Sequence, residues 1–274
     1  MKAVPRILLG LFFLGFSGSL LALQRNSLQR SPFDQGPGYV TSATIEKAGF
    51  IFARLRYSSG RQYYDYSGYG FRFGGGWSED FPKGDRQFVE GVSRLTRLKA
   101  RPTEAVIEPD SDEIFDFPWL YTVNVGTWVF SDSQAQRLHE YLMRGGFMVV
   151  DSFHGEVDWQ HFMAGMDQIL PGADHKWEEL DSKDPIFHVL YDLDERFQIP
   201  GIQYVNTGRT YEKDGFVPHW RAIRDDKGRI MVLMNFNMHL GDAWEHADDP
   251  IYPERFSSLA YRLGINYVIY GMTH

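Results

Sequence analysis

The stretch SDSQAQRLHEYLMRGGFMVVDSFHG, residues 131–155, indicates the fold class. Ser131 and Gln134 fit a capping box at the start of an amphipathic helix, and the glycine pair at 145–146 ends it. The apolar run at 147–150 then predicts a short buried strand. A strand that is apolar throughout and directly follows a helix is typical of a parallel sheet covered by helices on both faces.

The alternation of strand and helix continues on both sides of this stretch. We expect further strands at 49–57, 104–107, 117–123 and 229–237, and helices at 85–95, 159–169 and 253–272. Asp85 is the expected cap of its helix, and Gly264 is the expected weak point of the last one. The turn at 226–228 predicts a hairpin and so an antiparallel sheet edge. These elements predict one doubly wound, mostly parallel α/β domain at 49–274.

Composition limits the chemistry of the chain. With 274 residues and 43% hydrophobic side chains, it is long enough for one large core. It has no cysteine, which excludes disulfides, a thiolate nucleophile and a thiolate metal site. Its formal charge of −8, without a basic stripe, argues against a nucleic-acid partner.

The N-terminal residues have the pattern of an export signal. Lys2 and Arg6 precede an uncharged run that reaches residue 23, so we expect a signal peptide at 1–23 and a linker at 24–48. Cleavage would remove two positive charges and leave −10. The expected location is the periplasm or the exterior. Alternatively the leader stays uncut as an inner-membrane anchor, the only membrane contact that we expect.

A segment rich in tyrosine and glycine follows the first predicted strand, at 60–76. A loop of this length without regular structure is either functional or disordered. The sequence leaves open whether it is a lid.

The first candidate site follows the strand at 147–150. Asp151, Ser152 and His154 are candidate catalytic residues, because ligands of open α/β sheets bind at the carboxyl ends of the strands. His154 would be the general base, Asp151 its orienting partner or a metal ligand, and Ser152 a nucleophile. In the alternative, structural interpretation, Asp151 caps the next helix and His154 packs in the loop.

The second candidate site follows the strand at 229–237. His239, Asp242 and His246 are candidate ligands of a divalent metal, with His154 or His188 as a fourth, because imidazole and carboxylate suit such ions. No recognised metal motif is present, so these side chains could equally be solvated polar surface. We expect no other cofactor.

A third group contains cations and aromatic side chains. Arg54, Arg56 and Tyr57 leave the first strand, where arginines can clamp a carboxylate or phosphate. Alternatively they only balance nearby acids. We also expect Asp242, Trp244 and Glu245 to contribute to binding a small polar ligand.

Several segments together resemble one protein family. They are FARLRY (52–57), RLT (94–96), the stretch 141–155, DPIFH (184–188), GDAWE (241–245) and LGINY (263–267). From residue 49 to the end, the chain resembles the bacterial domain-of-unknown-function family 4159. The resemblance implies a flavodoxin-like sandwich of the class I glutamine-amidotransferase type, close to the ThuA-like branch. It also implies envelope proteins often encoded near MoxR-type ATPases and von Willebrand factor A-domain proteins, which are the expected partners.

In true amidotransferases of that fold, the turn after the corresponding strand presents a cysteine. This chain has Asp151, Ser152, Phe153 and His154 there, so glutamine hydrolysis by that route is excluded. The first functional expectation is therefore a binding or assembly domain of the envelope, with a polar pocket at the strand ends. The alternative is a hydrolase or sugar-modifying enzyme, metal-dependent or not, at the same pocket, and a third is a purely structural domain.

Overall fold

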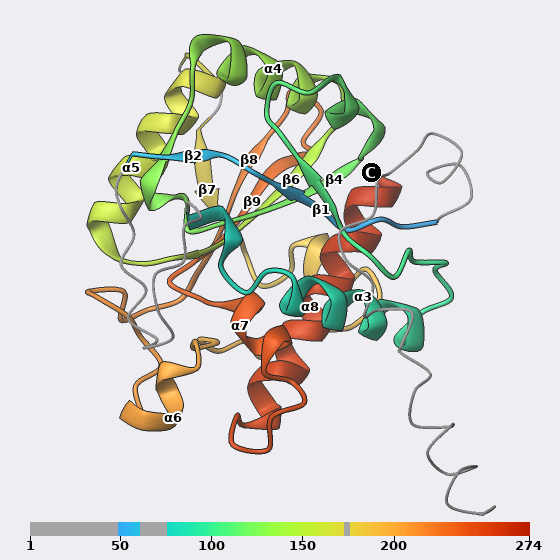
Figure 1. Ribbon diagram of the computed structural model, residues 1–274, viewed down its shortest axis with the longest axis vertical. Coiled ribbons are helices and arrows are strands. Elements are labelled where there is room, and N and C mark those ends of the chain that lie inside the picture. Colours follow the sequence, from blue (N-terminus) through green and yellow to red (C-terminus); the bar gives the residue numbers. More distant parts are fainter. Residues whose placement is uncertain (1–48, 61–75, 173–175) are drawn as a thin grey trace, which may run out of the picture. The chain divides into compact units, whose positions relative to one another are not determined.

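The computed structural model describes residues 49–60, 76–172 and 176–274 (Figure 1). The predicted leader, the linker and the tyrosine- and glycine-rich segment at 61–75 lie outside the described residues. In the part of the chain that is described, no helix combines the length and the apolar character needed to cross a bilayer.

A seven-stranded sheet forms the centre of the fold, in the order β3-β1-β4-β6-β9-β8-β7. Its strands are β1 (Ala53–Leu55), β3 (Ala105–Ile107), β4 (Trp119–Val123), β6 (Phe147–Phe153), β7 (Trp177–Glu179), β8 (His219–Arg224) and β9 (Ile230–Phe236). The neighbours from β3 to β9 pair in parallel, whereas β8 and β7 are antiparallel. This confirms the predicted mostly parallel sheet with an antiparallel edge. A separate small antiparallel pair joins β2 (Ser58–Ser59) to β5 (Trp128–Val129).

Helices cover both faces of the sheet (Figure 1). The helices that cover it are α3 (Lys83–Leu95), α4 (Asp132–Met143), α5 (Gly155–Ile169), α7 (Leu240–Glu245) and α8 (Glu254–Thr273). The short helix α6 (Gln203–Thr207) has no buried residue. The core on one face joins α4 and α5 to the sheet, for example through Leu138, Phe162 and Val150. On the other face, Phe88 of α3 stacks on Trp244 of α7. The fold is thus doubly wound, as predicted.

Local sequence explains the ends of α4. The Ser131 hydroxyl accepts a hydrogen bond from the Gln134 backbone N–H, and the Gln134 side chain accepts one from the Ser131 N–H, so the predicted capping box is present. Gly145 follows the helix with φ +106°, a conformation that glycine adopts without strain.

Two local predictions are wrong. The helix expected to begin at Asp85 begins at Lys83, and the Asp85 side chain turns inward to pair with Arg54 instead of capping the helix. Gly264 does not interrupt α8, which is continuous through it. A Cβ atom at that position would lie 2.5 Å from Phe88, so the glycine permits close packing.

Candidate metal centre

Backbone hydrogen bonds join the carboxyl ends of β6 and β9. The Asn237 N–H donates to the Phe153 carbonyl at 3.0 Å, and the Ser152 N–H donates to the Met238 carbonyl at 3.2 Å. Ser152 and Asn237 have φ of 55° and 63°, values that are uncommon outside glycine. Ser152 lies at the register shift of β6 between Val150 and Phe153, and Asn237 directly follows β9. The two strands therefore end side by side.

These turns place His154 and His239 near each other. His154 directly follows β6, and His239 precedes α7 as its N-cap residue. The centroids of the two imidazole rings are 6.1 Å apart, and each residue is only 5% exposed. The sequence predicted both as site residues, with His154 as a candidate catalytic base and as a possible fourth ligand of the metal site of His239.

Glu212 joins the two histidines from a segment between α6 and β8. Its neighbours hold this segment on the start of α5: Lys213 pairs with Asp158, and the Asp214 carboxylate accepts a hydrogen bond of 3.3 Å from the Glu156 N–H. Sequence reasoning missed Glu212, because it lies in an irregular segment that no motif or periodic pattern marks.

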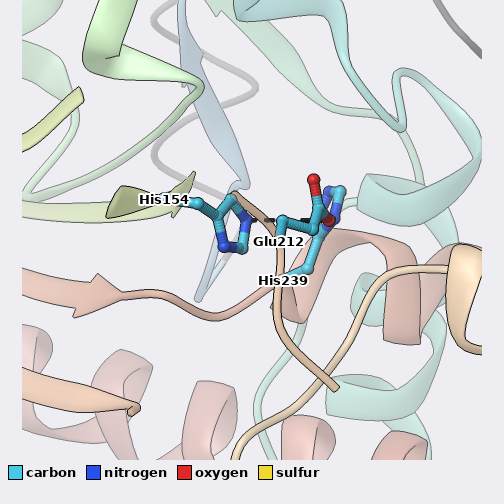
Figure 2. A group of neighbouring side chains, drawn as sticks. All are labelled: His154, Glu212 and His239. Atoms are coloured by element: carbon cyan, nitrogen blue, oxygen red, sulfur yellow. Dashed lines mark ion pairs between the residues drawn. The ribbon is translucent and has the colours of Figure 1, made fainter. Parts of the chain in front are cut away.

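The three side chains converge on one point (Figure 2). Glu212 Oε1 lies 3.8 Å from His154 Nε2 and 3.7 Å from His239 Nδ1. The three potential ligand atoms all lie within 4.8 Å of one another. With bonds of about 2.1 Å, ligand atoms of a tetrahedral ion are about 3.4 Å apart, and neighbouring ligands of an octahedral ion about 3.0 Å. The observed separations are nearer to the tetrahedral value.

The two ring nitrogens that face Glu212 are His154 Nε2 and His239 Nδ1. Both are buried and form no hydrogen bond with the described residues. The same is true of the other nitrogen of His154. A buried polar atom without a partner costs about 1–3 kcal/mol and needs an explanation. A cation bound between the two rings would be coordinated by the lone pairs of His154 Nε2 and His239 Nδ1.

The opposite side of the His239 ring has several partners. His239 Nε2 lies 2.9 Å from the Ser152 hydroxyl, which donates to Glu79 Oε2 at 2.5 Å, and 3.3 Å from Asp80 Oδ2. If Nδ1 binds a metal, Nε2 carries the proton and donates it to the Ser152 hydroxyl, which in turn donates to Glu79. Such outer partners orient metal-binding histidines in proteins.

Negative charge is concentrated around His239. Burial raises the pKa of Glu79 to about 7 and raises that of Asp80 as well. Burial acts to lower the pKa of His239, but Asp242, Asp80 and Glu79 outweigh it and raise this pKa well above its ordinary value. Without a metal the ring is therefore held as a cation. A bound metal ion would replace that proton.

The other two ligands already have the charge state that a metal needs. Burial lowers the pKa of His154 to about 4, so the ring is neutral at pH 7. Burial acts to raise the pKa of Glu212, but its interactions with His239 and His154 lower it to about 2. The group therefore offers a neutral imidazole and a carboxylate.

Asp151 has a different environment from the predicted one. Its Oδ2 atom accepts hydrogen bonds from the Tyr121 hydroxyl at 2.6 Å and from the backbone N–H groups of Leu240 and Gly241 at 2.8 and 3.0 Å. It caps α7, not the helix that follows it. Asp151 thereby fixes the helix that His239 precedes.

Arg54 is a buried positioning residue. It is fully buried, pairs with Asp85, and donates to the carbonyls of Trp77 and Glu79 at 2.9 and 3.0 Å. The guanidinium predicted to clamp a ligand is thus bound within the protein, where it holds the segment that carries Glu79 and Asp80.

The rest of the third predicted group also makes internal contacts. Arg56 pairs with Glu108 at the surface, and the Tyr57 hydroxyl donates to the Val123 carbonyl at 2.8 Å. Trp244 is fully buried, with its ring centroid 4.2 Å from that of Phe88.

The predicted trio of His239, Asp242 and His246 is close together, but the two rings face different oxygens of one carboxylate. Asp242 Oδ2 lies 3.5 Å from His239 Nδ1, and Oδ1 lies 3.8 Å from His246 Nε2. His188 pairs with Asp192 instead.

A family model described as a domain of unknown function (DUF4159) matches residues 51–272. No curated protein matches the chain.

Proposed function

The chain belongs to the DUF4159 family of domains of unknown function, and we propose that it is a metal-dependent hydrolase. One observation carries the proposal: two buried imidazole nitrogens, on His154 and His239, face the same oxygen of Glu212 and form no hydrogen bond with the described residues. Two histidines and one carboxylate, with a further position left for water, are a common ligand set of catalytic zinc.

The ligand types favour a borderline ion. Nitrogen and oxygen ligands without sulfur suit zinc, manganese or cobalt better than copper(I) or an iron–sulfur cluster. Such an ion lowers the pKa of bound water to about 7 and so supplies hydroxide at neutral pH. The hydroxide would add to a carbonyl carbon or phosphorus atom of the substrate, and the leaving group would depart with a proton.

Access to the ion would be from the side of Glu212. The Glu212 side chain is 33% exposed, whereas those of His154 and His239 are 6% and 7% exposed. Substrate would therefore approach beside Glu212, with the two rings behind the ion.

Three finer expectations belong to the same proposal. We propose export to the bacterial envelope on the leader pattern, and a ThuA-like relationship on the resemblance of the segments. Partnership with MoxR-associated ATPases and von Willebrand factor A-domain proteins rests on that resemblance alone. A binding or assembly role without catalysis is the competing function.

The test is hydrolysis of simple chromogenic substrates. The protein would first be freed of metal with a chelator. It would then be assayed with added Zn²⁺, Mn²⁺ or Co²⁺ on p-nitrophenyl acetate, p-nitrophenyl phosphate and bis-p-nitrophenyl phosphate. We expect metal-dependent turnover of at least one of them. His154→Ala should reduce it by more than about 100-fold, beyond the loss typical of outer-sphere changes. The matched control is His188→Ala, because His188 pairs with Asp192 outside the candidate site. This variant should retain the metal-dependent turnover.

Metal binding without turnover of any substrate would favour the binding role. Absence of metal binding would contradict the proposed metal centre itself.

A further inference from the structure

The carboxylate of Asp242 faces two clusters of potential ligands. Asp242 lies in α7, between His239 before the helix and His246 after it. Oδ2 is directed to the first histidine and Oδ1 to the second, at 3.5 and 3.8 Å. The spacing of four residues places Asp242 and His246 on one face of the turn.

The second cluster consists of Asp242, Glu245 and His246. His246 Nε2 lies 3.9 Å from Glu245 Oε2 and 3.8 Å from Asp242 Oδ1. These potential ligand atoms, one from each residue, lie within 4.8 Å of one another. The separations are similar to those in the group of His154, Glu212 and His239.

The burial and hydrogen bonding of Asp242 distinguish this cluster from solvated surface acids. Its side chain is only 9% exposed. Its Oδ2 atom accepts a hydrogen bond of 2.6 Å from the Ile202 N–H, whereas Oδ1 accepts none from the residues that the structure describes. The Oδ1 atom thus presents an acceptor oxygen to the imidazole of His246 at 3.8 Å, on the side of the carboxylate away from Ile202.

His246 also has an outer partner. Its other ring nitrogen, Nδ1, lies 3.8 Å from Asp249 Oδ2. A carboxylate behind the ring would favour a proton on Nδ1 and leave Nε2 free as a ligand, the same arrangement that Ser152 and Asp80 provide for His239.

We propose that Asp242, Glu245 and His246 bind a second divalent cation, and that the Asp242 carboxylate bridges it to the cation of the first group. The proposal rests on the proposed function, because the first cation belongs to that site. A pair of ions about 3.5–4 Å apart can hold the attacking water and an oxygen of the substrate at once. Glu245 and His246 are 24% and 22% exposed in their side chains, so the second ion would be on the accessible side.

The experiment measures the stoichiometry and magnetic coupling of bound manganese. Metal-free chain would be dialysed against Mn²⁺, its metal content measured by elemental analysis, and its electron paramagnetic resonance spectrum recorded. We expect two ions per chain with the spectrum of a spin-coupled pair. His246→Ala should bind one ion and give the six-line spectrum of an isolated Mn²⁺, and His188→Ala should behave like the wild type.

The variants separate the two proposals. One ion in both the wild type and His246→Ala would overturn the second site and leave the first. No ion in the wild type would overturn both. Should His246→Ala fail to fold, Glu245→Gln provides the same test, because this side chain is partly exposed and should lose only the second ion.

Discussion

Single residues around His239 show how the site can select one tautomer. The Ser152 hydroxyl lies between the imidazole and Glu79, at 2.9 and 2.5 Å. Its backbone has φ 55°, a value uncommon outside glycine. The hydroxyl can accept from Nε2–H and donate to the carboxylate at the same time, and Nδ1 is then left for a metal.

The first prediction concerns this hydroxyl. Ser152→Ala removes the acceptor of the Nε2 proton, and we expect zinc affinity to fall by about 10–100-fold, as for other outer partners of metal ligands. Competition titration with a chromogenic zinc chelator measures the change. Ser258→Ala, at an exposed position of α8, is the control and should bind zinc like the wild type.

The second prediction concerns the pH dependence of stability. Burial raises the pKa of Glu79 from 4.5 to about 7, so the folded state holds this proton more tightly than the unfolded chain. The contribution of Glu79 to the free energy of unfolding of the metal-free protein therefore falls as pH rises from about 4.5 to 7. Glu79→Gln should be more stable than the wild type at about pH 8, by up to about 3 kcal/mol, and equal to it at about pH 4.

Urea unfolding of both proteins at the two pH values tests this difference. An equal effect of the substitution at both values would show that the carboxyl group does not titrate as stated.

The third prediction compares two arginines of the same chain segment. Arg54→Ala leaves the Asp85 carboxylate buried without its cation, and we expect a loss of about 3–5 kcal/mol in the free energy of unfolding. Arg56→Ala breaks an exposed pair with Glu108 and should cost less than about 1 kcal/mol. Denaturant titration measures both, and similar costs would contradict the positioning role of Arg54.

At the scale of elements, α8 shows packing overriding helix propensity. Alanine stabilises a helix interior by about 1 kcal/mol relative to glycine. At position 264, however, a Cβ atom would lie 2.5 Å from Phe88 and 2.8 Å from Trp244, and overpacking of this kind costs about 1–3 kcal/mol. Gly264→Ala should therefore lower the melting temperature, whereas Ser258→Ala on the same helix should not. A rise in the melting temperature of Gly264→Ala would show that the aromatic rings move aside.

Elements with local signals could be predicted from the sequence. The capping box of α4 and the apolar run of β6 lie within a few residues, and both are present. The end of β6 could not be predicted, because it continues to Phe153 through its pairing with Phe236 of β9, a contact between distant segments. Strand pairing, not local composition, determines where His154 leaves the sheet.

At the scale of the whole molecule, topology assembles the candidate site from four separate segments. His154 and His239 could be located because they follow predicted strands whose ends meet. Glu212 and the pair Glu79 and Asp80 could not, since irregular segments bring them to the site and only three-dimensional contacts hold them there. The sequence therefore indicated the edge of the sheet, but not the full ligand set.

The central claim is that one divalent ion lies between His154, Glu212 and His239. The most direct measurement is an anomalous difference map from a crystal grown with Zn²⁺, with data collected on both sides of the zinc absorption edge. We predict a peak at about 2.0–2.2 Å from His154 Nε2, His239 Nδ1 and Glu212 Oε1. A map without that peak, with ordered waters hydrogen-bonded to the two ring nitrogens instead, would contradict the claim.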